Sequence, residues 1–122
     1  MFISGAVESF LQGATNAKVD LTTTNATTIY TAPSAATFNF SLINSILVSE
    51  DSGNADTITV TITDTSDAIF SVFKVKAVGA NGTVELLTKD LVLKSGEILK
   101  AQAATGGRLH VVASILEFAN YR

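Results

Sequence analysis

The chain has 122 residues and no cysteine, and only 16% of its residues are charged. This length favours one domain with a sizeable core, and the lack of cysteine excludes disulfides, thiolate catalysis and cysteine-based zinc sites. The net charge of −3, with eight scattered Lys and Arg residues, argues against a nucleic-acid partner. A surface covered largely by Thr, Ser, Asn and Ala instead suits contact with other proteins, as in a subunit of an assembly.

The N-terminal segment, residues 1–16, predicts a short amphipathic helix or an arm. Its apolar residues recur at helical spacing, and Gly13 and Asn16 would end the helix. Because so short a helix is marginal in water, it must dock on its own domain or on a neighbouring subunit, and both remain open. The segment is a poor signal peptide, and no apolar run approaches the ~20 residues of a membrane span. The interface residues expected here are Phe2, Ile3, Val7 and Phe10.

Residues 17–122 are predicted to form a single β-sandwich domain. Stretches rich in β-branched and aromatic residues alternate with turn signals roughly every 8–12 residues, which favours seven or eight strands in an all-β, antiparallel, jelly-roll-like sandwich. Pro33 places the preceding strand at an edge or ends it. The apolar phase slips after Leu42, which indicates a β-bulge near Asn44. Asn81-Gly82 predicts a type I′ hairpin turn.

The stretch "DTITVTITDT" alternates strictly between two kinds of side chain. Its Ile and Val residues belong to one face, which should enter the core, and its threonines form an uncharged row on the other. Strand propensity alone explains threonine there. An uncharged row is also an unguarded edge or face, so we expect a neighbouring subunit to cover part of it. The residues concerned are Thr57, Thr59 and Thr61.

No residue pattern predicts catalysis or a cofactor. His110 is the only histidine, and no Gly-x-Ser-x-Gly motif accompanies it. The acidic turn offers oxygen ligands suited to Ca²⁺ at Asp51, Asn54 and Asp56, but their spacing does not match an EF-hand loop. These three residues are weak metal candidates, and the turn is explained equally well by its turn-forming residues. We therefore expect a protein that is not an enzyme and that needs no cofactor.

Three segments resemble a family of small virion proteins of tailed bacteriophages. They are "IYT" at residues 29–31, "LVLKSGEILKAQA" at residues 91–103 and "VVASILE" at residues 111–117. The resemblance spans roughly residues 22–118 and describes a fold and its turns rather than a site. It implies a β-sandwich attached to the virion. Capsid decoration (cement) proteins of this build commonly sit on the outer shell as trimers where major capsid subunits meet.

Three functions follow as hypotheses. The first is a capsid decoration protein, located in the virion after assembly in the bacterial cytoplasm, with the major capsid protein or other virion proteins as partners. The second is a structural component of the neck, tail or a fibre, which fold alone cannot separate from the first. The third is a sugar-binding module for host attachment, which the absence of Trp and the presence of only two tyrosines disfavour.

Overall fold

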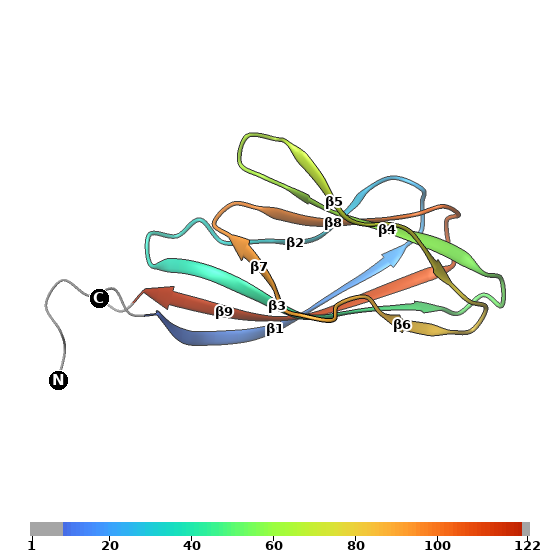
Figure 1. The fold of residues 1–122 in the computed structure, drawn as a ribbon, viewed down its shortest axis with the longest axis horizontal. Helices are drawn as coiled ribbons and strands as arrows, with labels where there is room; N and C mark the ends of the chain where they lie inside the picture. The colour runs from blue at the N-terminus through green and yellow to red at the C-terminus, as the bar shows by residue number, and fades with distance from the viewer. Residues whose placement is uncertain (1–8, 121–122) are drawn as a thin grey trace, which may run out of the picture.

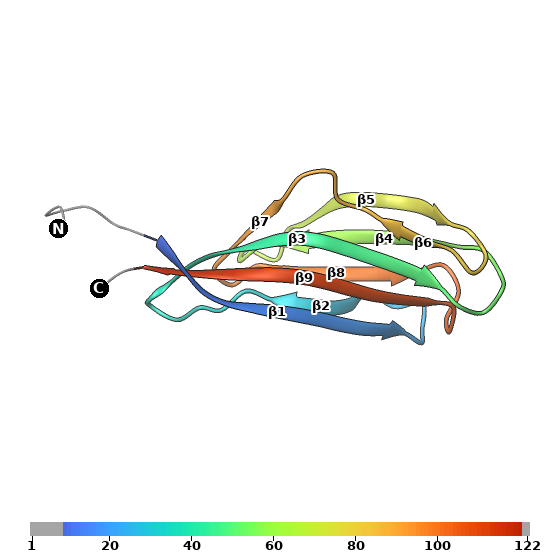
Figure 2. The ribbon, with the colours of Figure 1, turned by 90° about the horizontal axis from the view of Figure 1, so that it is seen from below.

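The computed structural model describes residues 9–120, which form two antiparallel sheets packed face to face (Figures 1 and 2). Sheet A has the order β1-β9-β3, with β6 and β7 both paired to the outer edge of β3. Its strands are β1 (Ser9–Leu21), β3 (Phe38–Glu50), β6 (Thr83–Glu85), β7 (Leu91–Lys94) and β9 (Leu109–Asn120). Sheet B has the order β2-β8-β4-β5. Its strands are β2 (Thr27–Thr31), β4 (Asp56–Thr63), β5 (Ile69–Val78) and β8 (Ile98–Ala103).

The connections make this sandwich a jelly roll. The chain crosses from one sheet to the other after β1, β2, β3, β5, β7 and β8, and all strand pairs are antiparallel. The expected all-β, jelly-roll-like sandwich is therefore confirmed. Nine strands occur within residues 9–120, rather than seven or eight, because the stretch after residue 82 is broken into the separate strands β6 and β7.

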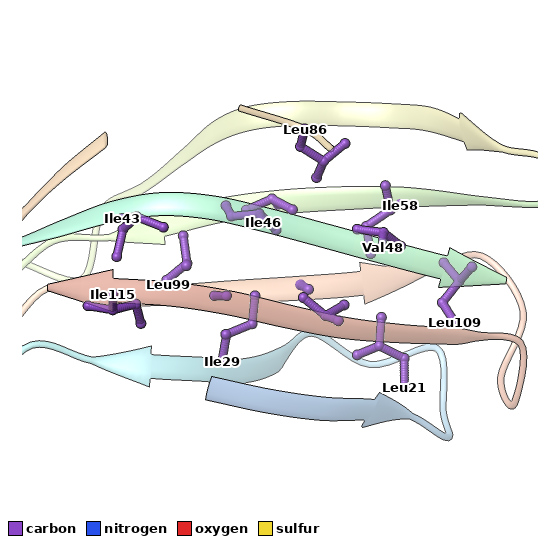
Figure 3. Close-up of a cluster of buried hydrophobic side chains, with 14 of the residues drawn as sticks. Leu21, Ile29, Ile43, Ile46, Val48, Ile58, Leu86, Leu99, Leu109 and Ile115 are labelled. Atoms are coloured by element: carbon purple, nitrogen blue, oxygen red, sulfur yellow. The ribbon is translucent and has the colours of Figure 1, made fainter. Parts of the chain in front are cut away.

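The core lies between the sheets and follows from strict alternation along the strands. In β4, Ile58 and Val60 are completely buried, while Thr57, Thr59 and Thr61 remain partly exposed on the outer side. In β9, the odd-numbered residues from Leu109 to Ile115 point inward in the same way. Figure 3 shows these aliphatic side chains meeting from both sheets. At ~25 cal/mol per Å² of apolar surface, their burial is the main stabilising contribution.

The N-terminal helix is absent from the described residues, and that expectation is wrong for residues 9–16. This part of the chain is extended in β1, which pairs with β9 from Ser9 opposite Asn120 to Leu21 opposite Leu109. The reason is that β9 supplies backbone hydrogen bonds along the whole segment, whereas an isolated short helix is barely stable. Residues 1–8 lie outside the described part of the chain. Among residues 9–120, no helix has the length and apolarity that crossing a membrane requires.

Three local expectations can be compared with the structure. The predicted bulge is confirmed, because the pairing of β3 with β9 shifts register between Ile43 and Ser45, on either side of Asn44. The strand before Pro33 is confirmed as an edge, since β2 pairs only with β8. The type I′ hairpin is wrong. Asn81 has a positive φ of 57°, but Gly82 has none, and the flanking strands β5 and β6 belong to different sheets.

Candidate interaction surfaces

The outer face of sheet A, here called face A, is built from rows of side chains that run across the strands. Register alone defines each row, because residues paired across neighbouring strands point to the same side of a sheet. At the end of face A near the start of β1, two successive rows are mostly apolar. We call these apolar side chains the apolar patch: Leu11, Ala14, Phe40, Leu42, Val92, Leu116 and Phe118.

Aromatic stacking and exposure characterise the apolar patch. The rings of Phe40 and Phe118 stack with centroids 4.8 Å apart and an interplanar angle of 13°. Leu11 remains 54% exposed and Val92 47% exposed at the two sides of the patch. A contiguous apolar area on a water-soluble surface is a marker of protein contact, and this one covers four neighbouring strands.

A cleft of about 630 Å³ adjoins the apolar patch at the β7 side. Phe40 and Val92 belong both to the patch and to the cleft wall. Thr65, from the turn between β4 and β5 in sheet B, also lines the cleft. The remaining lining residues are Asn39, Lys94, Ser95 and Glu97. The cleft therefore extends the apolar patch to the edge of the sandwich, where a protruding apolar side chain could enter it.

The predicted threonine row lies on the outer face of sheet B, called face B. It belongs to β4, an inner strand between β8 and β5, so the row is part of a face and not an edge. Thr59 has a local role, since its hydroxyl accepts a hydrogen bond at 3.0 Å from the backbone N–H of Val75. Val75 has a φ of 53°, a conformation that β-branched residues rarely adopt. Thr59 thus stabilises an irregular part of edge strand β5.

The interface residues expected near the N-terminus are only partly described. Phe2, Ile3 and Val7 lie outside the described residues. Phe10 belongs to β1, where it pairs with Ala119 and keeps 47% of its surface exposed. Because successive residues of a strand point to opposite faces, Phe10 lies on the other side of sheet A from Leu11, so the one described member of this set is not part of the apolar patch.

The acidic turn after β3 is organised around the buried carboxylate of Glu50. Glu50 is 2% exposed and accepts backbone N–H bonds from Ser52 at 2.7 Å, Gly53 at 3.1 Å and Asn81 at 2.9 Å. The Ser52 hydroxyl donates to it as well. Burial alone would raise the pKa of Glu50, but these hydrogen bonds outweigh it and lower the pKa to about 2. Glu50 therefore joins this turn to the loop before β6.

The three weak metal candidates contact different partners. Asp51 lies 3.4 Å from Nδ1 of His110, and Asp56 accepts a hydrogen bond from the backbone N–H of Thr105 at 3.1 Å. Asn54 hydrogen-bonds to Ser52 within its own turn. No group of three or more His, Asp or Glu side chains suited to a metal ion occurs in the part of the chain that the structure describes.

His110 lies on face A, at the end opposite the apolar patch. Its Nε2 is 3.4 Å from Oδ1 of Asp20 in β1, and its Nδ1 faces Asp51 on the other side. All three side chains are about half exposed, and ion pairs of this kind contribute little to stability. Its half-exposed position is that of a surface histidine.

The apolar patch is what the sequence interpretation missed. Its signal was present, because β9 and β3 carry apolar residues in both phases, such as Leu116 beside Ile115 and Leu42 beside Ile43. A strand buried on one face needs only one apolar phase. The second apolar phase of β3 and β9 indicated an apolar area on the outer face of their sheet.

Comparison with known proteins shows the fold. The sequence matches no protein-family description, and no curated protein is significantly similar to it. One chain in the acidic stable capsid structure of Helicobacter pylori bacteriophage KHP30 is similar with a TM-score of 0.55 and 11% identity. That match covers 96% of this chain and 99% of the phage capsid chain, so the two have similar lengths.

A second similar structure comes from a different virus. A chain of infectious bursal disease virus, Gx strain, matches with a TM-score of 0.53 and 10% identity. The match covers 93% of this chain but 32% of the viral chain, so this protein spans about a third of that length. At such low identities both matches show a shared β-sandwich fold.

Proposed function

We propose that this chain is a non-enzymatic structural protein of a virus particle, and specifically a capsid decoration protein of a bacteriophage. It binds the outer shell where major capsid subunits meet and stabilises the shell. The observation that carries this proposal is the match, along nearly the full length of both chains, to a chain in a phage capsid structure. The resemblance of residues 29–31, 91–103 and 111–117 to small virion proteins supports the same conclusion independently.

The surface chemistry supports a role in protein contact. Face A carries the apolar patch, and the threonine row of face B has no charged member. The net charge of −3 suits a place on the outside of a shell, away from packaged DNA. A protein that binds only the intact shell stabilises that shell by mass action. The stabilisation grows with the logarithm of the ratio between the free concentration of the protein and its dissociation constant.

Three of the described carboxylates have structural roles, which supports a non-catalytic use. Glu50 holds two loops together, and Glu117 accepts a hydrogen bond from Tyr30 between the sheets. Glu85 accepts bonds from the Ser45 hydroxyl and from backbone N–H groups. A carboxylate whose acceptor sites are filled by its own fold is poorly placed to act on a substrate.

The contact residues of the assembly remain proposals. The N-terminal residues Phe2, Ile3 and Val7, with Phe10, are proposed to reach a neighbouring virion subunit. The row of Thr57, Thr59 and Thr61 on face B is proposed to be covered in the particle. A homo-oligomer is expected, and the family resemblance favours a trimer.

The decisive experiment is to measure how many copies the purified virion contains. Quantitative mass spectrometry should give a ratio to the major capsid protein of the order of one. Removing the gene should yield shells that open at lower temperature, and adding the purified protein back should restore the opening temperature. A few copies per particle, located at the tail, would contradict decoration and support the neck, tail or fibre alternative. Binding to sugars on a glycan array would support the host-attachment alternative instead.

A further inference from the structure

Face A can be read as five rows that cross sheet A from β1 to the edge formed by β6 and β7. Each row contains one even-numbered residue of β9, from Phe118 at the apolar end to His110 at the other. From the apolar end they are Leu11-Phe118-Phe40-Lys94, then Ala14-Leu116-Leu42-Val92, then Asn16-Ser114-Ser45, then Lys18-Val112-Leu47-Glu85, and finally Asp20-His110-Ser49-Thr83. This order makes face A complementary to a second copy of itself.

Two copies of face A can face each other across a two-fold axis that lies in the plane between them and runs parallel to the strands. This operation places each row opposite the same row of the other copy, with the order of its residues reversed. Strand β1 of one copy then lies over the β6 and β7 edge of the other, and β9 lies over β3. Aligned packing of two sheets, with mean strand directions within about 30° of each other, is an ordinary geometry. Under this operation every row meets a row of its own composition.

The apolar rows complement themselves in this arrangement. Ala14, a small residue, comes opposite Val92, which is 47% exposed, and Leu116 comes opposite Leu42. In the first row Phe118 comes opposite Phe40, and the exposed Leu11 comes opposite Lys94, whose aliphatic stem can cover apolar surface. Burial of these side chains supplies the driving force, and the small polar row of Asn16, Ser114 and Ser45 separates them from the charged end.

The charged rows are complementary as well. Lys18, an exposed residue of β1, comes opposite Glu85 of β6, and Asp20 comes opposite the hydroxyl of Thr83. The Glu85 carboxylate is oriented by the Ser45 hydroxyl and by the backbone N–H groups of Ile46 at 2.8 Å and Leu87 at 3.2 Å. A fixed anion that meets a flexible cation favours one register of the two faces over others.

The size of face A is sufficient for a specific contact. Successive rows are two residues apart along the strands, at about 3.3 Å per residue, and neighbouring strands are about 4.8 Å apart. Five rows and four strands therefore span roughly 34 Å by 19 Å, or about 650 Å² on each copy. Specific interfaces bury roughly 600–1,000 Å² on each partner. The central row of face B, by contrast, is polar throughout and consists of Thr28, Lys100, Thr61 and Ser71.

We infer that face A is the interface of a two-fold symmetric dimer of this chain, with the apolar patch as its core and Lys18 opposite Glu85 at its charged end. The inference goes beyond the proposed function and does not depend on it, because pairing is measured with the purified chain alone. It also differs from the trimer that the family resemblance favours, and the two are separated by mass.

Cysteine cross-linking tests the geometry directly, because the natural chain has no cysteine. Ala14→Cys and Val92→Cys in one chain lie three strand spacings apart, about 14 Å, too far for a disulfide within one molecule. Two sheets packed face to face lie about 10 Å apart, so a short thiol cross-linker that bridges this gap but does not reach across about 14 Å should give a covalent dimer of the double variant in high yield. The matched control is Thr28→Cys with Ser71→Cys, which has the same spacing on face B. Equal dimer yields from the two variants would overturn the inference.

Solution mass provides the second test. In a dilution series followed by sedimentation, the natural full-length chain should pass from dimer to monomer. Leu42→Asp, at the centre of the apolar patch, should raise the dissociation constant at least tenfold, whereas Thr61→Asp on face B should leave it unchanged. A chain that is monomeric or trimeric at every concentration would refute the dimer. So would equal effects of Leu42→Asp and Thr61→Asp, provided that both variants keep the natural circular dichroism spectrum.

Discussion

The phenol of Tyr30 in β2 donates a hydrogen bond to the carboxylate of Glu117 in β9 and so joins the two sheets through the sandwich. The same hydroxyl lies 2.7 Å from Oγ of Ser41, which is completely buried. Burial and the bond to Glu117 raise the pKa of Tyr30 above its ordinary value of 10.0. These three polar side chains lie within an otherwise aliphatic layer, so each depends on the cluster for its hydrogen-bond partner.

We predict that Tyr30→Phe destabilises the fold by about 1–3 kcal/mol, because it leaves buried polar groups without a partner. Urea denaturation of the two proteins measures this difference. Thr28→Val, an exposed change in the same strand, is the control and should stay within about 0.5 kcal/mol of the natural protein. A Tyr30→Phe variant of unchanged stability would show that water replaces the phenol without loss.

The raised pKa of Tyr30 also predicts a loss of stability in alkali. The unfolded chain loses this proton near pH 10, whereas the folded chain holds it to a higher pH. The contribution is therefore fully present below pH 10 and decreases as the pH rises above it. Denaturation midpoints measured across this range should fall more steeply for the natural protein than for Tyr30→Phe.

Glu50 predicts the behaviour in acid. Its pKa is lowered to about 2 from an ordinary value of 4.5, so the unfolded chain takes up this proton before the folded chain does. The stability that Glu50 contributes is present above pH 4.5 and is lost as the pH falls towards 2. Glu50→Gln should lower stability at neutral pH and flatten this acid dependence. Glu85, whose pKa is also lowered, should preserve part of the slope in the variant.

Denaturation midpoints measured over that pH range test the prediction. Asp90→Asn, at an exposed position between β6 and β7, removes a carboxylate outside this network and is the matched control. Parallel acid profiles for the natural protein and Glu50→Gln would contradict the role assigned to Glu50.

A glycine in the turn before β9 predicts a steric effect. A Cβ added at Gly106 would lie 2.4 Å from the backbone oxygen of Thr22, so the loop after β1 would have to move. Gly106→Ala should therefore cost about 1–3 kcal/mol, as overpacking does. Gly79→Ala meets no atom within 4 Å and should be nearly neutral. Calorimetric melting of both variants makes the comparison, and equal melting temperatures would exclude the clash.

Deleting residues 1–8 tests the proposed N-terminal contact without disturbing the sandwich, since β1 begins at Ser9. We expect the truncated protein to melt like the natural one but to bind shells at least tenfold more weakly. Deletion of residues 1–16 would remove eight of the 13 residues of β1 and so confuse the two effects. Normal binding of the protein that lacks residues 1–8 would exclude these residues from the interface.

The sequence by itself determined the fold class and several local features. The alternation of Ile58 and Val60 with their neighbouring threonines, the phase slip at Asn44 and the strand end before Pro33 all appear in the structure. Each depends on side chains a few residues apart, where backbone geometry dictates which face a residue takes. The threonine row was predicted for the same reason.

Only the tertiary structure decided what depends on long-range pairing. Residues 9–16 form a strand because β9, about a hundred residues later, offers them hydrogen bonds. Leu42 and Leu116 become neighbours in the apolar patch because β3 and β9 pair in one register, which a bulge at Asn44 shifts by one residue. Glu50 is buried because the loop of Asn81 folds over it. Periodicity tells which face a residue takes, but the register between distant strands decides which residues share that face.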